Sequence, residues 1–138
     1  MKTAHKERGA VAVEMAIVLP LLLLILIGTM EFGRVFNVQN SLTQAAREGA
    51  RFAAIHHSDS DFADGDVATV ALAAAPSLSN LEILVDDDAG SCASGENVTV
   101  TTNVTLGSLS GFLDAGFFGS PGIFPMALEG VGVMRCGG

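Results

Sequence analysis

The sequence contains no tryptophan and no tyrosine, and it has two cysteines among its 138 residues. Its eight phenylalanines must therefore supply the large aromatic side chains of any folded core. Lysine and arginine are absent from residues 52–134, a stretch that holds eleven acidic residues. An acidic region of this kind argues against nucleic acid or anionic lipid as its partner.

Motifs for catalysis are also lacking. The chain has three histidines, one of them His5 in the basic leading segment, and it has no phosphate-binding loop. Residues 107–111 read Gly-Ser-Leu-Ser-Gly, which places Leu109 where a nucleophile elbow carries serine. Neither cysteine has a histidine beside it. We expect a protein that is not an enzyme and that binds no cofactor.

The polar stretch 56–66 contains two histidines and four aspartates, which raises the question of a metal site. Asp59 and Asp61 fit positions one and three of a calcium loop, but Ala63 takes the fifth position and Asp64 the sixth, where glycine is required. Two adjacent histidines do not define a zinc site. We expect a solvated linker without metal.

What the sequence does have is a long apolar run at residues 10–30, preceded by Lys2, Lys6 and Arg8. A bilayer core needs roughly 20 residues of apolar helix, which this run supplies. The positive-inside rule places the basic end in the cytoplasm and sends the remaining chain across the membrane. We expect residues 10–30 to form a single transmembrane helix.

One carboxylate, Glu14, interrupts this run. A charge inside such a segment costs about 2.5 to 3.5 kcal/mol on insertion scales. A cleaved secretory signal would need an Ala-x-Ala-like site after the run, which is missing, and a plain anchor leaves Glu14 unexplained. A cut between Gly9 and Ala10 would place a charged amine one helical turn from Glu14, so that the two neutralise each other within or between subunits.

Glycine followed by apolar residues and a glutamate at the fifth mature position resembles the class III signal of type IV pilins. In addition, residues 8–14, Val18-Leu19-Pro20-Leu21-Leu22, Gly28, residues 31–34 and residues 45–51 together resemble the TadE-like family. Its members are pilin-like components of the tight-adherence (Tad or Flp) pilus system. The resemblance covers residues 8 to about 54. Major pilins of this system are shorter and often carry Tyr or Phe where this chain has Met15, so the resemblance points to a minor pilin or pseudopilin.

The resemblance implies a prepilin peptidase that cuts between Gly9 and Ala10, and an assembly role for Glu14. It also implies a location in the bacterial inner membrane, with residues 1–9 as cytoplasmic leader and residues 31–138 as a periplasmic domain. The expected partners are membrane lipid, other pilins or pseudopilins and the inner-membrane assembly platform, and the protein either enters an extracellular pilus or stays at its base. The open alternative is an anchored periplasmic binding or structural module without leader cleavage, which contacts a ligand through the phenylalanines of residues 112–124.

The spacing of apolar residues predicts an α+β fold. One helix is expected to continue from the membrane segment to about residue 54, with a small-residue face at residues 45–54. Asp64 or Asp66 is expected to cap a second short helix over 67–75, which Pro76 ends. Three strands of a small antiparallel sheet are expected to pack on the long helix, at residues 81–85, 98–106 and 126–135.

The connections carry further expectations. Residues 86–90 form an acidic turn, and residues 107–125 form a loop with exposed phenylalanines and a turn of helix at 109–114. Cys92 and Cys136 are each expected near a strand end. The expected exterior location permits a disulfide between them, worth on the order of 3 to 4 kcal/mol, although two free thiols are the alternative.

Overall fold

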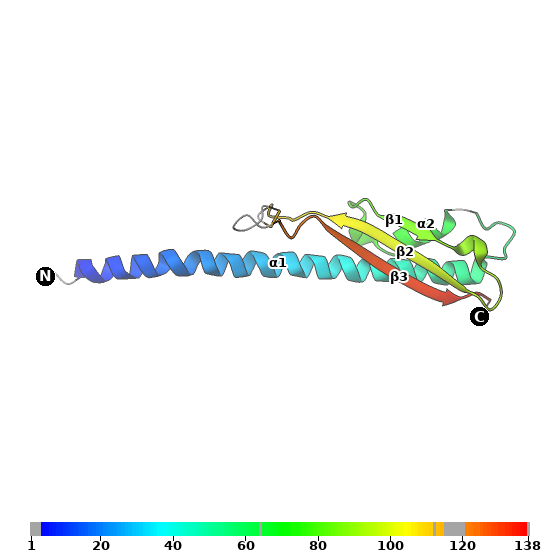
Figure 1. Ribbon diagram of the computed structural model, residues 1–138, viewed down its shortest axis with the longest axis horizontal. Coiled ribbons are helices and arrows are strands. Elements are labelled where there is room, and N and C mark those ends of the chain that lie inside the picture. Colours follow the sequence, from blue (N-terminus) through cyan, green and yellow to red (C-terminus); the bar gives the residue numbers. More distant parts are fainter. Residues whose placement is uncertain (1–3, 64, 112, 115–120, 138) are drawn as a thin grey trace. The chain divides into compact units, whose positions relative to one another are not determined.

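The computed structural model describes residues 4–63, 65–111, 113–114 and 121–137. It divides into two compact units, residues 1–34 and 35–138, and each is described by itself. Helix α1 (Ala4–His56) passes through both units. The second unit adds α2 (Asp66–Ala73), β1 (Leu84–Asp87), β2 (Asn97–Leu106), β3 (Met126–Arg135) and two short 3-10 turns, Pro76–Leu78 and Ala89–Ser91 (Figure 1). The expected α+β class, with a long first helix, a short second helix and a small sheet, is confirmed.

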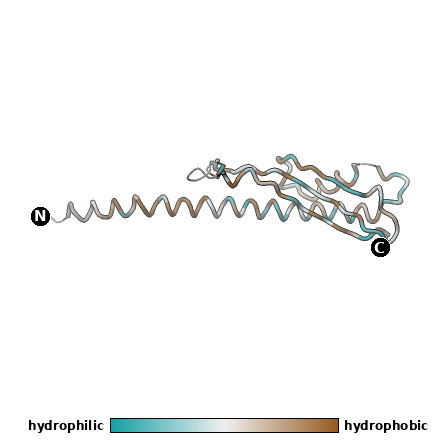
Figure 2. The backbone as a smooth tube through the Cα atoms, viewed as in Figure 1, coloured by the Kyte–Doolittle hydropathy of each residue, from teal (hydrophilic) through white to brown (hydrophobic). Residues whose placement is uncertain are grey.

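In the first unit, α1 is continuous through Pro20. Proline removes one backbone hydrogen bond, which membrane helices tolerate. The apolar side chains of this part point outward along its length: Val13 is 63% exposed, Ile17 68% and Leu22 60%. Figure 2 shows the same stretch as a run of hydrophobic residues. The helix in this unit is therefore apolar on its outer surface.

The second unit is built around an antiparallel sheet with the strand order β1-β2-β3. The central strand β2 alternates as expected, with one set of side chains buried against the helices: Val98, Val100, Thr102, Val104 and Leu106. The bounds of β3 also match the expected strand. Because side chains alternate across a strand, one face of the sheet forms the core and the other meets solvent.

The part of α1 beyond Val35 packs on the inner face of the sheet through small residues. Ala45, Ala46, Ala50 and Ala53 are all buried, which confirms the expected small-residue face. A Cβ atom built at Gly130 of β3 would lie 2.5 Å from the Leu42 carbonyl carbon, and one at Gly132 would meet the backbone of Ala46. The backbones of β3 and α1 are thus in contact where β3 carries glycine. We call Gly130, Gly132, Leu42 and Ala46 the glycine seam.

Thr102 supports the seam from the central strand. Its hydroxyl is fully buried and lies 3.0 Å from the Leu42 carbonyl oxygen and 3.3 Å from that of Gly130, so that it donates to these acceptors. A buried hydroxyl without a partner would cost about 1 to 3 kcal/mol. The Thr102 hydroxyl is therefore hydrogen-bonded beside the contact of Gly130 with Leu42.

The disulfide between Cys92 and Cys136 is present. Cys136 follows β3 directly, and Cys92 lies between the second 3-10 turn and the start of β2. The bridge therefore joins the end of β3 to the segment before β2, with each cysteine near a strand end as expected. Cys136 is 1% exposed and packs with Ala50, Val67 and Val98. The bridge is thus part of the core at the end of the sheet.

Two expectations about local structure were wrong. The first strand begins three residues later than expected, and Asp86 and Asp87, expected in a turn, pair with Thr101 and Val100. Asp66 is not the cap of α2, because it is the first helical residue and Gly65 takes the cap position with a φ of 97°. The Asp66 carboxylate instead accepts a hydrogen bond from the Ala63 backbone N–H at 2.9 Å. Asp64, the other expected cap, lies outside the described residues.

The loop after β2 also differs from the expectation. Residues 109–111 and 113–114 are described and are not helical, so the expected helical turn is not seen there. Phe124, expected to be exposed, is 6% exposed and belongs to the core with Leu42 and Leu106. Phe112, Phe117 and Phe118 lie outside the described residues.

Candidate assembly site

The candidate site lies on α1, on residues that the first unit holds in helical geometry. Gly9, Ala10 and Glu14 all fall inside the helix, and all three are exposed. Ala10 and Glu14 are four residues apart, so they lie on one side of the helix one turn from each other. The structure therefore places the expected cleavage bond and the expected assembly carboxylate on a common helical face.

Gly9 has no structural role that the described residues reveal. A Cβ atom built on it would meet nothing within 4 Å. Glycine in a helix interior is about 1 kcal/mol less favourable than alanine. The described part of the fold therefore gives no reason for glycine at this position.

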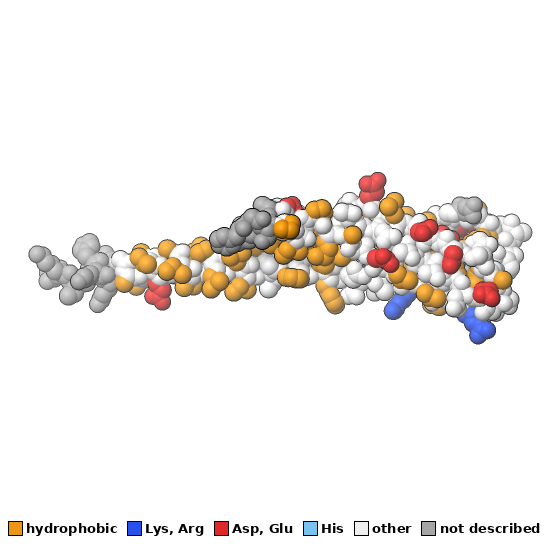
Figure 3. Space-filling view, viewed as in Figure 1, with side chains coloured by type: hydrophobic (Ala, Val, Ile, Leu, Met, Phe, Trp, Pro, Cys, Tyr) orange, Lys and Arg blue, Asp and Glu red, His pale blue; other side chains and the backbone are white. Residues whose placement is uncertain are grey.

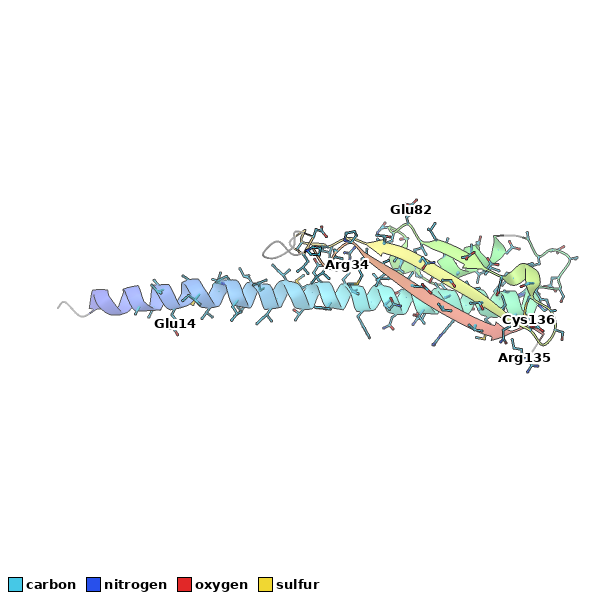
Figure 4. The ribbon with its side chains drawn as sticks, in the orientation of Figure 1. Glu14, Arg34, Glu82, Arg135 and Cys136 are labelled. Atoms are coloured by element: carbon cyan, nitrogen blue, oxygen red, sulfur yellow. A yellow bond between two sulfur atoms is a disulfide. The ribbon has the colours of Figure 1, made fainter. Side chains whose placement is uncertain are left out.

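Glu14 projects from the helix in Figure 4 and is exposed. Within the described part of the chain it makes no hydrogen bond and no ion pair. Apolar side chains surround it along the helix, among them Val11, Val13 and Met15, which are 55% to 63% exposed. Glu14 is thus an acidic side chain on an apolar helical surface.

The same helix is the membrane-span candidate among the described residues. Its span runs over Gly9–His56 and is apolar enough to cross a membrane, by length and composition. None of its most apolar window is buried within the chain. An apolar helix that the protein leaves uncovered needs lipid or other protein around it. A single-pass membrane anchor is compatible with this observation.

The polar stretch after α1 holds its side chains in local contacts. The Nδ1 atom of His56 lies 3.0 Å from the Phe52 carbonyl oxygen, and that of His57 lies 3.2 Å from the Ala54 carbonyl oxygen. The His56 ring also stacks on Phe52, with centroids 4.4 Å apart. In the described ranges no group of three or more His, Cys, Asp or Glu residues is placed to hold a metal ion.

Comparison with known families addresses the N-terminal part of the chain. Residues 9–51 match the family model described as TadE-like protein. Over these residues the chain is similar to that family. No curated protein and no solved structure matches the chain.

The TadE-like match begins at Gly9 and ends at Arg51. The match includes Ala10, Glu14, the apolar run and the buried small residues Ala45, Ala46, Gly49 and Ala50, which pack against the sheet. The expected resemblance is therefore confirmed for α1, while β1, β2 and β3 lie beyond the matched residues. The roles of Gly9, Ala10 and Glu14 stay predictions, and the structure adds that the three residues are close neighbours along one helix.

Sequence reasoning missed the glycine seam. Gly130 and Gly132 alternate within a strand, and glycine inside a strand often marks a close approach of another backbone. That pattern could have indicated a contact. It could not have named Leu42 and Ala46 as the residues contacted, because the contact is tertiary.

Proposed function

We propose that this protein is a TadE-like pseudopilin or minor pilin that takes part in assembling Tad/Flp pili, which are type IV-like and serve adhesion and biofilm formation. The observation that carries the proposal is the match of residues 9–51 to the TadE-like family, on a helix that holds Gly9 and Glu14 at pilin-like spacing. In this proposal residues 10–30 span the bacterial inner membrane. Residues 1–9 are then cytoplasmic, and residues 31–138 form the periplasmic domain.

The proposal includes a cut by a prepilin peptidase between Gly9 and Ala10. A glycine that the fold does not require supports this, since a residue without a Cβ atom lets another protein's backbone approach closely. The Gly9–Ala10 bond lies inside α1, so the peptidase must unwind the first turns of the helix before it cuts. Opening a helix end is the least costly local unfolding that a helix undergoes.

Glu14 acquires its partner through that cut. The new amine at Ala10 is positive and lies one turn from the carboxylate, on the same chain or on a neighbour shifted along the assembly. Pairing offsets the cost of holding the carboxylate in lipid, which is about 2.5 to 3.5 kcal/mol on insertion scales. Where the pairing joins two subunits, it favours assembly once the leader is gone.

The apolar surface of α1 would supply the second contribution to assembly. Other pilins or pseudopilins could pack against the exposed side chains of residues 10–30 in place of lipid. The partners in this proposal are the peptidase, those subunits and the inner-membrane assembly platform. The role is structural, without catalysis, cofactor or nucleic acid.

Sequencing the N-terminus of the mature protein tests the cut. We expect Ala10 as the first residue of the wild-type protein, and a retained leader in a Gly9→Val variant. Gly28→Ala is the matched control, because a Cβ atom at Gly28 also meets nothing within 4 Å. An intact leader on wild-type protein, with pili unaffected by Gly9→Val, would contradict the proposal.

A Glu14→Gln variant tests the assembly role. The neutral side chain inserts at lower cost but offers the amine no charge, so we expect a protein that reaches the membrane and fails in pilus assembly. Met15→Leu, at the next position, is the control and should assemble normally. The alternative, an anchored binding module, predicts full activity for Glu14→Gln. That alternative relied on exposed phenylalanines in residues 112–124 to contact a ligand, and Phe124 is buried.

A further inference from the structure

The outer edge of β3 is open. β3 pairs with β2 on one side, and no described segment adds a strand on the other. Val131 and Val133 face away from the helix and are 43% and 53% exposed. Proteins usually protect a long apolar edge strand with charges, proline or a covering segment, because its backbone groups are ready to pair with another chain.

The backbone groups on that edge can be assigned by alternation. The Cys136 N–H bonds to the Glu96 carbonyl oxygen across the sheet, so even-numbered residues of β3 turn their groups toward β2. Odd-numbered residues turn outward, and the Glu129 carbonyl accordingly accepts a hydrogen bond from Gln39 Nε2 at 2.6 Å. Gln39 thus covers the edge at Glu129, and the stretch from Val131 to Arg135 remains open.

The opposite edge of the sheet has a complementary character. β1 pairs with β2 alone among the described strands, and Leu84 is 69% exposed. Leu84 and Asp86 lie opposite Asn103 and Thr101, and Thr101 lies opposite Val131. Leu84, Asp86 and Val131 therefore project from the same outer face of the sheet. The β1 edge offers an apolar side chain followed by an acid, and the β3 edge offers Val133 followed by a cation.

Charge separates the two edges. The cations of the second unit are Arg47 and Arg51 on α1 and Arg135 at the end of β3. Arg47 adjoins β3, since a Cβ atom at Gly132 would lie 2.6 Å from its backbone nitrogen. Figure 3 shows basic side chains at the lower margin of this unit, and acidic side chains over the rest of the visible face and at the lower right. Figure 4 places Arg135 at the far end of β3.

From these observations we infer that β3 of one copy pairs with β1 of a second copy of this chain, in parallel, along the open edges. Val133 then lies beside the partner's Leu84, and Arg135 lies beside the partner's Asp86. The backbone groups on the two edges can pair in this register. In β3, Val133 and Arg135 turn their N–H and C=O groups to the open edge. In β1, Val85 and Asp87 turn theirs to the open edge. The inference rests on the proposed function in one respect, which is that both copies are inserted in one membrane.

Direction decides between this pairing and its competitor. Leu42 and Ala46 follow Gly130 and Gly132 in the same order, so α1 and β3 run the same way in this unit. β1 and β3 are both antiparallel to β2, so a parallel β3–β1 pair keeps the α1 segments of the two copies pointing in one direction. An antiparallel β3–β3 pair would place Glu129 opposite the partner's Arg135, but it would reverse one of the helices.

The inferred contact is also open-ended. Each copy uses a different edge on each side, so the first pair leaves one β3 edge and one β1 edge available. Head-to-tail contacts of this kind produce rings or extended assemblies according to the rotation between copies. Backbone hydrogen bonds at such an edge supply affinity, while the side chains beside them select the partner.

Photo-cross-linking of the full-length protein in native membranes tests the inference. A photoreactive residue is placed at Val133 of one tagged copy, and a second copy carries another tag. We expect a cross-linked dimer whose joined peptide comes from residues 82–88 of the second copy. The same residue at Leu72 of α2 is the control and should give no such product. Absence of the dimer, or a product joined to β3, would overturn the inference.

Exchange of charges gives an independent measurement. Arg135→Asp and Asp86→Arg should each lower the cross-linked fraction by about tenfold, because like charges then face each other. Mixing an Arg135→Asp copy that carries the photoreactive residue with an Asp86→Arg copy should restore the product to within about twofold of wild type. Asp59→Arg, on an exposed loop, is the matched control. A mixture that stays as poor as the single variants would overturn the pairing.

The two proposals can fail separately. Normal pili without a cross-link from Val133 to β1 would overturn the edge pairing and leave the pilin role intact. A cross-link from Val133 to β1 on a protein whose leader stays uncut, with pili unaffected by Gly9→Val, would overturn the pilin role and leave the edge pairing.

Discussion

The two parts of α1 use opposite kinds of side chain. Residues 10–30 carry large apolar side chains that remain exposed, such as Ile17 at 68%, whereas residues 38–54 carry alanine and glycine that are buried. The large side chains of the first part are not covered by the described residues. The small side chains of the second part let the sheet pack close to the helix backbone. One continuous helix is therefore exposed through its large apolar side chains in one unit and forms a core element in the other.

Removing the disulfide should give the largest effect and should act on the second unit alone. Cys92 and Cys136 are 44 residues apart, and opening a ring of that size costs about 4 kcal/mol in the chain-entropy description. For the double Cys92→Ser, Cys136→Ser variant we expect faster hydrogen exchange in β2 and β3, and unchanged protection over residues 10–30. Equal loss of protection in both parts would show that the two parts of α1 are not independent.

Gly132→Val should be nearly as damaging. The first added carbon would meet the Ala46 backbone, which cannot move aside as a flexible side chain could, so we expect a loss of about 3 kcal/mol in the unfolding free energy. Ala127→Val adds similar volume to the exposed face of the same strand and should stay within about 0.5 kcal/mol of wild type. Denaturant titration in detergent measures both, and equal stabilities would refute the glycine seam.

Alanine at two helical glycines gives the smallest and most direct comparison. A Cβ atom at Gly49 would lie 3.2 Å from both Ala71 Cβ and Val100 Cγ1, whereas one at Gly28 meets nothing within 4 Å. We expect Gly49→Ala to lose about 1 kcal/mol, because crowding exceeds the gain in helix propensity. Gly28→Ala should leave unfolding of the second unit unchanged. Thermal unfolding monitored by circular dichroism measures both variants. A larger loss of stability in Gly28→Ala than in Gly49→Ala would contradict the prediction.

Features determined by residues that are neighbours in the sequence were predicted well. β2 and β3 were predicted closely, because alternation of valine and threonine, or of apolar and small residues, is visible within ten consecutive positions. The site predicted at Gly9, Ala10 and Glu14 rests on an equally local pattern and stays a prediction. β1 was misplaced, because Asp86 and Asp87 have poor strand propensity and are held by pairing with β2.

Features that depend on contacts between distant segments could not be predicted from the sequence. Phe124 lies in a stretch rich in glycine and proline, and only its contacts with a core of residues from α1 and β2 show that it is buried. The open edges of β1 and β3 require the strand order, which propensity does not provide. The cap at Gly65 was missed because aspartate is the commoner cap, and Asp66 is used one position later.

The disulfide also determines what a protease can do to this molecule. Both long strands, and the loop between them, lie inside the ring that Cys92 and Cys136 close. A single cut within that loop would leave the two fragments covalently joined, with β2 and β3 still paired. The domain would then run as one species on a denaturing gel until a reductant separated its pieces, so it can be nicked without being lost.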